Sequence, residues 1–514
     1  MRADRRNLFI ERLLRRFRFT LTPRNDGYCC LRSKTLKMKR FELKTLLVAL
    51  LLCMASFAVK AKVTMTPLFS DNMVLQQQSK VAVWGWTDAK SNVTVETSWN
   101  NRSYTAKPDH DGKWKVMVET PAAGGPYEMT VSDGTPQTIK NVLIGEVWLC
   151  SGQSNMEMPM KGFPGQSVLG SNMDILKSKN ANIHLITVPR SSKTVEQDNY
   201  EGAWKMANPE SVSDFSATAY YFGRLMQQML GVPVGLIDVS YGGSCVQAWM
   251  SRNTAVSFED KQVPEPGDKI PVPNRTPTVL FNGMLHPVIG YGIKGCIWYQ
   301  GETNYIEPDR YEELFPTMVK EWRFLWGEGD FPFYYMQIAP FDYSVFTPTE
   351  FHEKYNSAYL RDAQRKALDT IPNSDMAVIM DIGEKDCIHP SHKQMTGERL
   401  ALLALAETYD MKGFGYKSPS YKAMEIKGST VIVSFNNVEN GLTSFGKDLT
   451  TFEIAGKDKR FYPATAVLRR KSVMLSSPNV TEPVAVRYAF KDFVVGQLFG
   501  TDGLPVSSFR TDDW

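Results

Sequence analysis

The sequence predicts an α/β fold in which a doubly wound parallel sheet is flanked by all-β, sandwich-like domains. Between about residues 141 and 410, apolar runs alternate with helical patterns, which is typical of a parallel sheet with helices on both faces. Before and after that region, short runs of alternating polarity are separated by turn residues, a pattern typical of β-sandwiches.

The central sheet is expected to contain five strands, because five apolar runs are nearly continuous, as in strands buried on both faces. They span residues 143–149, 234–240, 293–299, 333–338 and 376–380. Apolar side chains also recur at helical spacing over 219–229, before the stop signal Gly231, and over 360–368. We therefore expect two of the covering helices at those positions.

The flanking domains are expected to consist of strands. Runs at 80–86, 92–97 and 114–118 alternate with turns, and runs at 429–435 and 484–488 do the same near the other end. This pattern divides the chain into an N-terminal β-sandwich domain over 62–140, the α/β domain over 141–410 and a C-terminal β domain over 411–514.

The first 61 residues are predicted to be absent from the working protein. A basic stretch at 38–44, an apolar run at 45–59 and small residues ending at Ala61 follow the plan of a secretory signal peptide, which we assign to 38–61. Residues 1–37 carry many arginines and no hydrophobic pattern, so we interpret them as a spurious extension upstream of the true initiator, Met38. A basic targeting extension is the alternative. The mature chain is expected to be periplasmic or secreted.

The formal net charge of +4 is due to this leader. Its 61 residues hold 15 of the 59 basic and 4 of the 55 acidic side chains, which leaves 44 basic and 51 acidic ones and a net charge of −7. We therefore expect no nucleic-acid partner. No later stretch approaches the ~18 apolar residues of a membrane span, so no membrane association is expected of the mature form. The oligomeric state stays open.

A candidate nucleophile lies where the first strand of the predicted sheet ends. The segment Gly-Gln-Ser-Asn-Met at 152–156 directly follows the apolar run 142–150, and ligands of open α/β sheets bind beyond the carboxyl ends of the strands. Ser154 would open a helix whose first N–H groups are free to stabilise an oxyanion. The alternative is an ordinary polar residue at a helix N-cap.

Polar residues also follow the second and third strands. Tyr-Gly-Gly-Ser at 241–244 brings two glycines, and the N–H of Gly242 or Gly243 is a candidate oxyanion donor, although an isolated pair of glycines more often forms an ordinary tight turn. Gln-Gly-Glu-Thr-Asn at 300–304 offers the amide groups of Gln300 and Asn304 as further donors, with Glu302 bracing the loop.

The fifth strand leads into a candidate acid and base, Asp386 and His389. A serine nucleophile needs an imidazole within hydrogen-bond reach, and that imidazole needs a carboxylate that fixes its tautomer. Three neighbours offer the same chemistry, and we rank them lower: Asp381, Glu384 and His392.

Together these blocks resemble the sialate O-acetylesterases of the SGNH (GDSL-like) hydrolase superfamily. The resemblance covers most of the chain after the leader and rests on four motifs: residues 152–156, Trp-Tyr-Gln-Gly-Glu-Thr-Asn at 298–304, Asp386-x-x-His389-Pro390, and Phe-Arg-Thr-Asp-Asp-Trp at 509–514. It implies a flavodoxin-like, three-layer SGNH hydrolase domain and metal-free, cofactor-free removal of O-acetyl groups from sugars, with 9-O-acetylated sialic acid the expected substrate.

The resemblance also implies roles for individual residues. Ser154 matches the nucleophile, His389 the base and Asp386 its partner, while the N–H groups of Ser154 and Gly243 match the oxyanion hole. Gln153 stands where many relatives carry an acid, and the third block departs from the superfamily pattern, so Gln300 and Asn304 both remain candidates for the third donor. The candidate substrate-binding residues are Gln153, Gly242, Glu302 and Trp298.

Two other functions remain open. An acetyl esterase acting on another acetylated glycan, such as xylan, would use the same triad. A non-catalytic carbohydrate-binding protein would have no need of Ser154, Asp386 and His389 together. Trp148, Trp249, Trp298 and Tyr299 are candidates to stack on a sugar ring, although aromatic residues near strand ends more often belong to the core.

Four cysteines remain after the leader: Cys150, Cys245, Cys296 and Cys387. An exported protein is permitted disulfides. All four nevertheless lie on or beside predicted strands, where small buried thiols are common, so we expect free structural cysteines.

Overall fold

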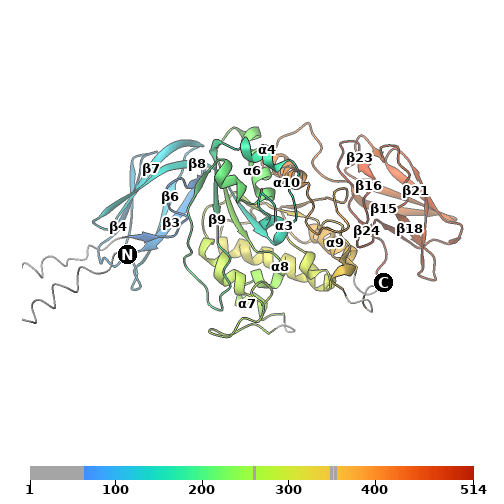
Figure 1. The fold of residues 1–514 in the computed structure, drawn as a ribbon, viewed down its shortest axis with the longest axis horizontal. Helices are drawn as coiled ribbons and strands as arrows, with labels where there is room; N and C mark the ends of the chain where they lie inside the picture. Colours follow the sequence, from blue (N-terminus) through green and yellow to red (C-terminus); the bar gives the residue numbers. More distant parts are fainter. Residues whose placement is uncertain (1–62, 259–261, 348–350, 352–355) are drawn as a thin grey trace, which may run out of the picture. The chain divides into compact units, whose positions relative to one another are not determined.

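The computed structural model describes residues 63–514, apart from 259–261, 348–350 and 352–355 (Figure 1). The described residues form one compact unit. The predicted extension over 1–37 and signal peptide over 38–61 lie outside the described residues and stay predictions.

The centre of this unit is a sheet with the order β10-β9-β11-β8-β12-β13-β14. All neighbouring pairs on this path are parallel except the edge pair β10–β9. Each of the five predicted strands is present. Numbered in chain order, those five lie in the order 2-1-3-4-5, so the chain reverses direction across the sheet between β8 and β12. The strands are β8 (Pro136–Gly152), β9 (Asn180–Thr187), β10 (Lys205–Ala207), β11 (Val234–Ser240), β12 (Gly295–Tyr299), β13 (Phe333–Met336) and β14 (Ser374–Ala377).

Helices cover both faces of the sheet (Figure 1). On one face lie α6 (Ala217–Leu230) and α10 (Lys393–Glu407), which pack against each other. On the other lie α8 (Pro308–Trp326) and α9 (Ser357–Lys366). Two hydrophobic clusters result: one contains residues of α6 and α10, and the other contains residues of α8 and α9 together with core residues of the N-terminal and C-terminal strands. Helix α6 contains the predicted 219–229, and α9 with the turn after it contains the predicted 360–368. The α/β fold class is confirmed.

Strand β8 joins the N-terminal strands to the central sheet. Its first part pairs with β7 (Gly124–Ser132) and β2 (Val74–Gln76), and its last part pairs with β11 and β12. The domain boundary predicted at 140/141 falls inside this single strand. The other N-terminal strands are β1 (Thr64–Met65), β3 (Lys80–Trp86), β4 (Val93–Thr97), β5 (Arg102–Ala106) and β6 (Lys113–Glu119).

The C-terminal residues form strands only. One four-stranded sheet has the order β15-β16-β21-β20, a second has the order β19-β18-β22-β24, and β17 pairs with β23. The strands are β15 (Ser420–Lys427), β16 (Thr430–Asn436), β17 (Leu442–Thr443), β18 (Phe452–Ala455), β19 (Phe461–Pro463), β20 (Thr465–Leu468), β21 (Ser472–Ser476), β22 (Ala485–Tyr488), β23 (Phe499–Gly500) and β24 (Phe509–Arg510).

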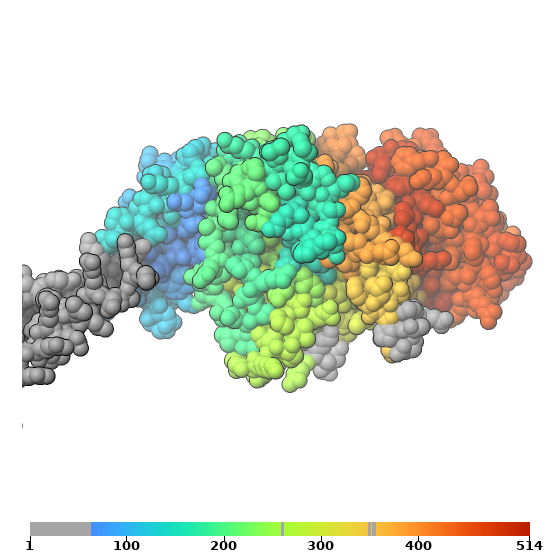
Figure 2. Space-filling view, viewed as in Figure 1, coloured from blue at the N-terminus to red at the C-terminus, as the bar shows by residue number. Residues whose placement is uncertain are grey.

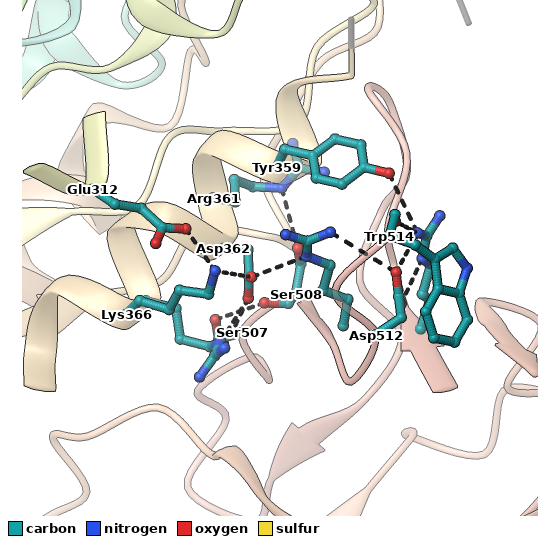
Figure 3. A network of polar contacts seen from close by, with 12 residues as sticks. Glu312, Tyr359, Arg361, Asp362, Lys366, Ser507, Ser508, Asp512 and Trp514 are labelled. Atoms are coloured by element: carbon teal, nitrogen blue, oxygen red, sulfur yellow. Dashed lines mark hydrogen bonds and ion pairs between the residues drawn. The ribbon is translucent and has the colours of Figure 1, made fainter. Parts of the chain in front are cut away.

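Helix α9 binds these C-terminal strands through a buried arginine (Figure 3). The Arg361 guanidinium donates to the carbonyl of Lys491 and lies 3.5 Å from the carbonyl of Ala489 and 3.4 Å from Oγ of Ser508. Burial lowers its pKa to about 10, so it stays charged at neutral pH. Next to it, buried Asp362 lies 3.4 Å from Arg510 of β24. The space-filling view shows the last residues of the chain, in red, against the yellow and orange segment that includes α9 (Figure 2).

Within the described part of the chain, no helix has both the length and the apolar character that a membrane crossing requires. Among the described residues, Cys150, Cys245, Cys296 and Cys387 form no disulfide, as expected.

Candidate active site

Ser154 lies where two neighbouring strands of the central sheet end. Gly152, the last residue of β8, has φ 143°, and a Cβ there would lie 2.1 Å from the carbonyl oxygen of Tyr299 at the end of β12. The Gln153 N–H donates to the same oxygen at 2.9 Å. Ser154 follows as the first residue of the short helix α3 (Ser154–Glu157) and is partly exposed. The serine therefore has the position that the sequence predicted, beside the reversal point of the sheet.

The glycine turn after β11 lies against this serine. A Cβ at Gly242 would lie 3.3 Å from Cβ of Ser154, so a side chain at 242 would crowd the candidate nucleophile. The Gly242 N–H donates to Oε2 of Glu157 at 2.8 Å. Gly243 has φ 69° and is partly exposed, and its N–H donates to no acceptor among the described residues. Of the two glycines, Gly243 thus keeps an N–H available for an oxyanion.

Side chains from three segments hold this turn. Glu157 of α3, which accepts from Gly242, forms a two-point ion pair with Arg190 through Nε and Nη2, at 2.5 and 2.6 Å. The guanidinium of Arg190 stacks over the ring of Tyr241, 4.7 Å from its centroid. Asn274 donates to the Gly242 carbonyl at 2.6 Å, and Nε of Arg275 lies 3.3 Å from the Gly243 carbonyl.

The amides of Gln300 and Asn304 do not present free donors, contrary to their predicted role in the oxyanion hole. Both side chains are fully buried. Gln300 Nε2 donates to the Ser244 carbonyl at 3.1 Å and to Asn304 Oδ1 at 2.7 Å. Asn304 Nδ2 donates to Gln247 at 3.0 Å and to Glu307 at 2.8 Å. Buried amide groups must be paired within the protein, so these residues brace the loop instead.

Three of the predicted substrate-binding residues are also buried. Gln153 accepts the backbone N–H groups of Gly301 and Thr303 through Oε1, at 3.2 and 3.3 Å. Glu302 is 4% exposed and accepts from Asn155. Trp298 is 0% exposed and packs among aromatic rings, 5.5 Å from Trp322 between centroids. The prediction that these three residues contact the substrate is wrong, because their side chains are buried and support the site from inside the protein. Trp148, Trp249 and Tyr299 are equally buried and belong to the core.

A buried polar chain runs behind Ser154. Asn155 accepts from Nζ of Lys393, at the start of α10, and donates to Glu302 Oε1 at 2.5 Å and to the Ile388 carbonyl at 3.1 Å. Burial lowers the pKa of Lys393 to about 7, with the charge of Glu302 acting in the opposite direction. Burial raises the pKa of Glu302. The residue after the nucleophile is thus tied to the residue before the candidate base.

His389 lies in the loop that leads into α10. Its Nδ1 is 2.5 Å from Oε1 of Gln166, and Phe163 packs edge-on against its ring with centroids 5.3 Å apart. Its Nε2 is buried and has no hydrogen-bond partner in the described part of the chain. Burial, and to a lesser extent the charge of Lys393, lower the pKa of His389 to about 4. The imidazole is therefore neutral at physiological pH, as a general base must be.

Asp386 does not contact His389 in the structure. It is exposed and forms no hydrogen bond or ion pair with a described residue. The other acidic neighbours have partners of their own, since Asp381 pairs with Arg399 at 2.6 Å and Glu384 accepts the Ser391 N–H at 2.7 Å. The predicted Ser-His-Asp arrangement is thus incomplete, and Gln166 occupies the place expected for the acid.

In the described part of the chain, no group of three possible metal ligands lies at Ser154 or His389. Among the described residues, one group could bring three ligand atoms within 4.8 Å of one another, namely Asp109, His110 and Asp111. All three are exposed and lie between β5 and β6, so they do not belong to this site.

The sequence did not single out Gln166, Lys393, Arg190 or Glu157. Asn155 and Glu157 follow Ser154 directly, and Lys393 opens the helix after His389, so proximity to the motifs was a usable signal for these residues. Gln166 lies 223 positions from His389, and no pattern along the chain joins the two.

The chain is similar to known proteins over most of the described residues. Residues 144–406 match the model of a family described as "Carbohydrate esterase, sialic acid-specific acetylesterase". The chain is 28% identical over 463 residues to a sialate O-acetylesterase of Pongo abelii, covering 82% of this chain and 86% of that protein. It is 29% identical over 394 residues to the sialate O-acetylesterase of Homo sapiens, covering 70% and 73%.

A solved structure is also similar. The crystal structure of a carbohydrate acetylesterase from Xanthomonas citri superposes with a TM-score of 0.80 at 34% identity, over 88% of this chain and 100% of the other. The family model and the curated relatives together identify a carboxylic ester hydrolase. More particularly, the chain belongs to the carbohydrate esterase family of sialic acid-specific acetylesterases, because the family model matches half of its length.

Proposed function

We propose that this protein is a serine esterase that removes O-acetyl groups from sialic acids, with 9-O-acetyl sialate as substrate and Ser154 and His389 as the reacting pair. The observation that carries the proposal is the arrangement around Ser154. Ser154 follows the end of β8, is partly exposed and lies against the glycine turn at 242–243, in which the Gly243 N–H has no acceptor among the described residues. Nε2 of His389 also has no hydrogen-bond partner in the described part of the chain.

The proposed reaction has two halves. Oγ of Ser154 attacks the acetyl carbonyl carbon while Nε2 of His389 takes the hydroxyl proton, and the tetrahedral oxyanion accepts from the N–H groups of Ser154 and Gly243. His389 then returns the proton to the departing sugar hydroxyl, which leaves an acetyl-enzyme. Water, deprotonated by His389, next attacks the acetyl-enzyme and releases acetate.

The charge beside the site favours an acidic sugar over a neutral one. Arg275 is exposed, holds the Gly243 carbonyl and has no acidic partner among the described residues. A sialic acid carries a carboxylate that such a guanidinium can bind with two hydrogen bonds, whereas acetylated xylan is neutral. The alternative, an esterase for another acetylated glycan, is favoured by the similarity to the Xanthomonas citri carbohydrate acetylesterase.

Two further parts of the proposal concern architecture and location. We propose a flavodoxin-like SGNH hydrolase domain with flanking β domains, supported by the strand order 2-1-3-4-5 and the strands on either side of it. We also propose export to the periplasm or medium by cleavage after Ala61, which the N-terminal sequence of the protein isolated from its natural host would test.

The function is tested by acetate release from a 9-O-acetylated sialoside and from acetylated xylan. The protein starting at residue 62 is compared with Ser154→Ala, and Ser103→Ala, an exposed serine on β5, serves as the matched control. Loss of the nucleophile should lower turnover by about 10⁴-fold or more, with the control at the wild-type rate.

Each other outcome changes a different part of the proposal. Activity on xylan alone would transfer the substrate to a neutral glycan. Undiminished activity in Ser154→Ala would reject the nucleophile. Binding of both glycans without release of acetate would indicate the third candidate, a non-catalytic carbohydrate-binding protein.

A further inference from the structure

The partner of His389 in the structure is an amide. Oε1 of Gln166 is an acceptor only, so the 2.5 Å contact places a proton on Nδ1 and leaves the lone pair of the neutral ring on Nε2. Nε2 is the nitrogen without a partner in the described part of the chain. The contact therefore selects the tautomer that a general base needs.

The segment that carries Gln166 is fixed by its backbone. The Gln166 N–H donates to the Phe163 carbonyl at 2.9 Å, which closes a tight turn. Gly162, at φ 83°, allows a close approach, since a Cβ there would lie 2.3 Å from the Gln166 carbonyl oxygen. The Leu169 N–H donates at 2.9 Å to the carbonyl of Ser391, two residues beyond His389. The turn and the histidine loop are thus joined by backbone as well as by side chains.

An amide can fill the orienting role. In papain-like proteases an asparagine orients the catalytic histidine, so a carboxylate is not obligatory. The two kinds of partner differ in one measurable respect, because a carboxylate raises the pKa of the imidazole and a neutral amide does not.

We infer that Gln166 positions His389 for the reaction proposed above, in the place that the sequence predicted for Asp386. The inference rests on the proposed function. Gln166 is a positioning residue, since it acts through His389 and holds the base in one tautomer and one orientation.

The charged groups around His389 come from two elements. Lys393 belongs to α10 and is linked to Glu302 through Asn155, while Glu384 and Asp386 belong to the loop of His389 itself. None of them changes in a Gln166 variant, so a shifted pH profile in such a variant reports the new side chain at 166.

The test measures kcat and KM for acetate release from pH 3.5 to pH 8 in the protein starting at residue 62. Gln166→Ala should lower kcat by about 10²–10⁴-fold, the range that a positioned base contributes, with KM little changed. Gln166→Glu should restore most of the activity near neutral pH and move the acidic limb of kcat/KM upward by about 1–3 pH units, because a carboxylate now faces Nδ1. The exposed Gln394, varied to Ala, is the matched control and should behave as the wild type.

The competing role is tested in the same series with Asp386→Asn, for which we expect nearly wild-type kcat. A loss of about 10⁴-fold in Asp386→Asn together with normal activity in Gln166→Ala would overturn the inference and restore the aspartate as the orienting group. An unshifted acidic limb in Gln166→Glu would also overturn it, and this readout holds even if Gln166→Ala fails to fold. Retained activity in His389→Ala would instead reject the proposed function.

Discussion

At the scale of single residues, hydrogen-bond partners distinguish the groups proposed to react from the groups that hold the site in place. The amide N–H groups of Gln300 and Asn304 follow the right strand and have the right chemistry, but they are taken up by buried partners, and Oε1 of the buried Glu302 accepts from Asn155. Ser154, the Gly243 N–H and Nε2 of His389 are the groups left available. Residue type suggests a role, and the neighbours decide whether the group is free to perform it.

The burial of His389 predicts an enzyme that keeps its activity in mild acid. Its pKa is lowered to about 4, first by burial and then by the charge of Lys393, so the base stays neutral as the pH falls from 7 to 5. We expect kcat/KM for acetate release to be flat over that range and to fall at lower pH with an apparent pKa of about 4. Lys393→Met removes the positive charge that lowers the pKa of His389, so the acidic limb of kcat/KM should move to higher pH. An acidic limb near 6.5, the ordinary value for histidine, would contradict the buried environment.

The Asn155 side chain predicts a coupled loss of stability and activity. Asn155→Ala removes the group that bridges Lys393 and Glu302, and both side chains stay buried. The free energy of unfolding should fall by about 3–5 kcal/mol, the cost when a buried charge loses its partner. It also frees the Ile388 carbonyl next to the base, so kcat should fall.

Urea unfolding measures the change in stability. Asn282→Ala is the matched control, because that buried asparagine donates to one carbonyl and its loss should cost about 1–3 kcal/mol. Equal effects of the two substitutions would show that the bridge between Lys393 and Glu302 adds nothing.

At the scale of elements, the site depends on how closely the ends of β8 and β12 approach. The two strands are paired up to Gly152 and Tyr299, and the Gln153 N–H continues the pairing by one more hydrogen bond. That approach places Ser154 at the reversal point of the sheet, and only a residue without a Cβ fits at 152. The close approach of β8 and β12 therefore requires a glycine at position 152.

Gly152→Ala should therefore destabilise the protein strongly. The new Cβ would lie 2.1 Å from a backbone oxygen that cannot rotate away, and φ 143° is unfavourable for alanine. We expect a loss of about 1–3 kcal/mol from backbone strain, with a comparable loss from overpacking.

The control is Gly231→Ala, at φ 67° with no atom within 4 Å of the new Cβ, which carries left-handed backbone strain without the clash. The difference between the two variants in chemical unfolding measures the clash together with the additional strain at φ 143°. If the two lost equal stability, the close approach of β8 and β12 would not be a constraint.

Strand β9 was not predicted from the pattern of apolar residues in the sequence. Its buried part is the four residues 183–186 and includes His184, so it gives no continuous apolar run. It nevertheless pairs in parallel with β11 and extends the sheet at that edge. Pairing with an existing strand, rather than its own composition, makes this segment a strand.

At the scale of the whole described chain, α9 connects the C-terminal strands to the active-site loop. On one side Arg361 binds carbonyl groups of the C-terminal segment. One turn further along, Gln364 donates to the Gln300 carbonyl at 3.0 Å, at the start of the loop behind Ser154. The C-terminal strands thus support the helix that supports the loop.

Arg361→Met is expected to reduce both stability and activity. Each buried carbonyl left without a donor costs about 1–3 kcal/mol, and Arg361 serves several. Lys366→Met on the same helix is the control, because its side chain is 37% exposed and its ion pair with Glu312 should contribute no more than about 1 kcal/mol.

The midpoint of urea unfolding and kcat are the two measurements for these variants. A normal kcat in Arg361→Met at a temperature where it is fully folded would show that the C-terminal strands stabilise the chain without supporting the loop.

The sequence by itself determined five of the seven strands of the central sheet, the helices at 219–229 and 360–368, and the position of the segment that carries Ser154. These follow from local patterns, since apolar runs, helical spacing and glycines at strand ends are all short-range features. It also predicts that Ser154, Gly243 and His389 share one site, because the carboxyl ends of parallel strands share one edge.

The tertiary structure alone decided which polar groups near that edge are free. Whether an amide or carboxylate has a partner depends on residues far away in the chain, as with Gln166 and His389 or Asn155 and Lys393. It also decided that β8 continues without interruption across the predicted domain boundary, because neighbouring strands pair with both of its halves. The physical reason is the same in both cases: hydrogen bonds between distant segments are satisfied only after folding, and no local pattern records them.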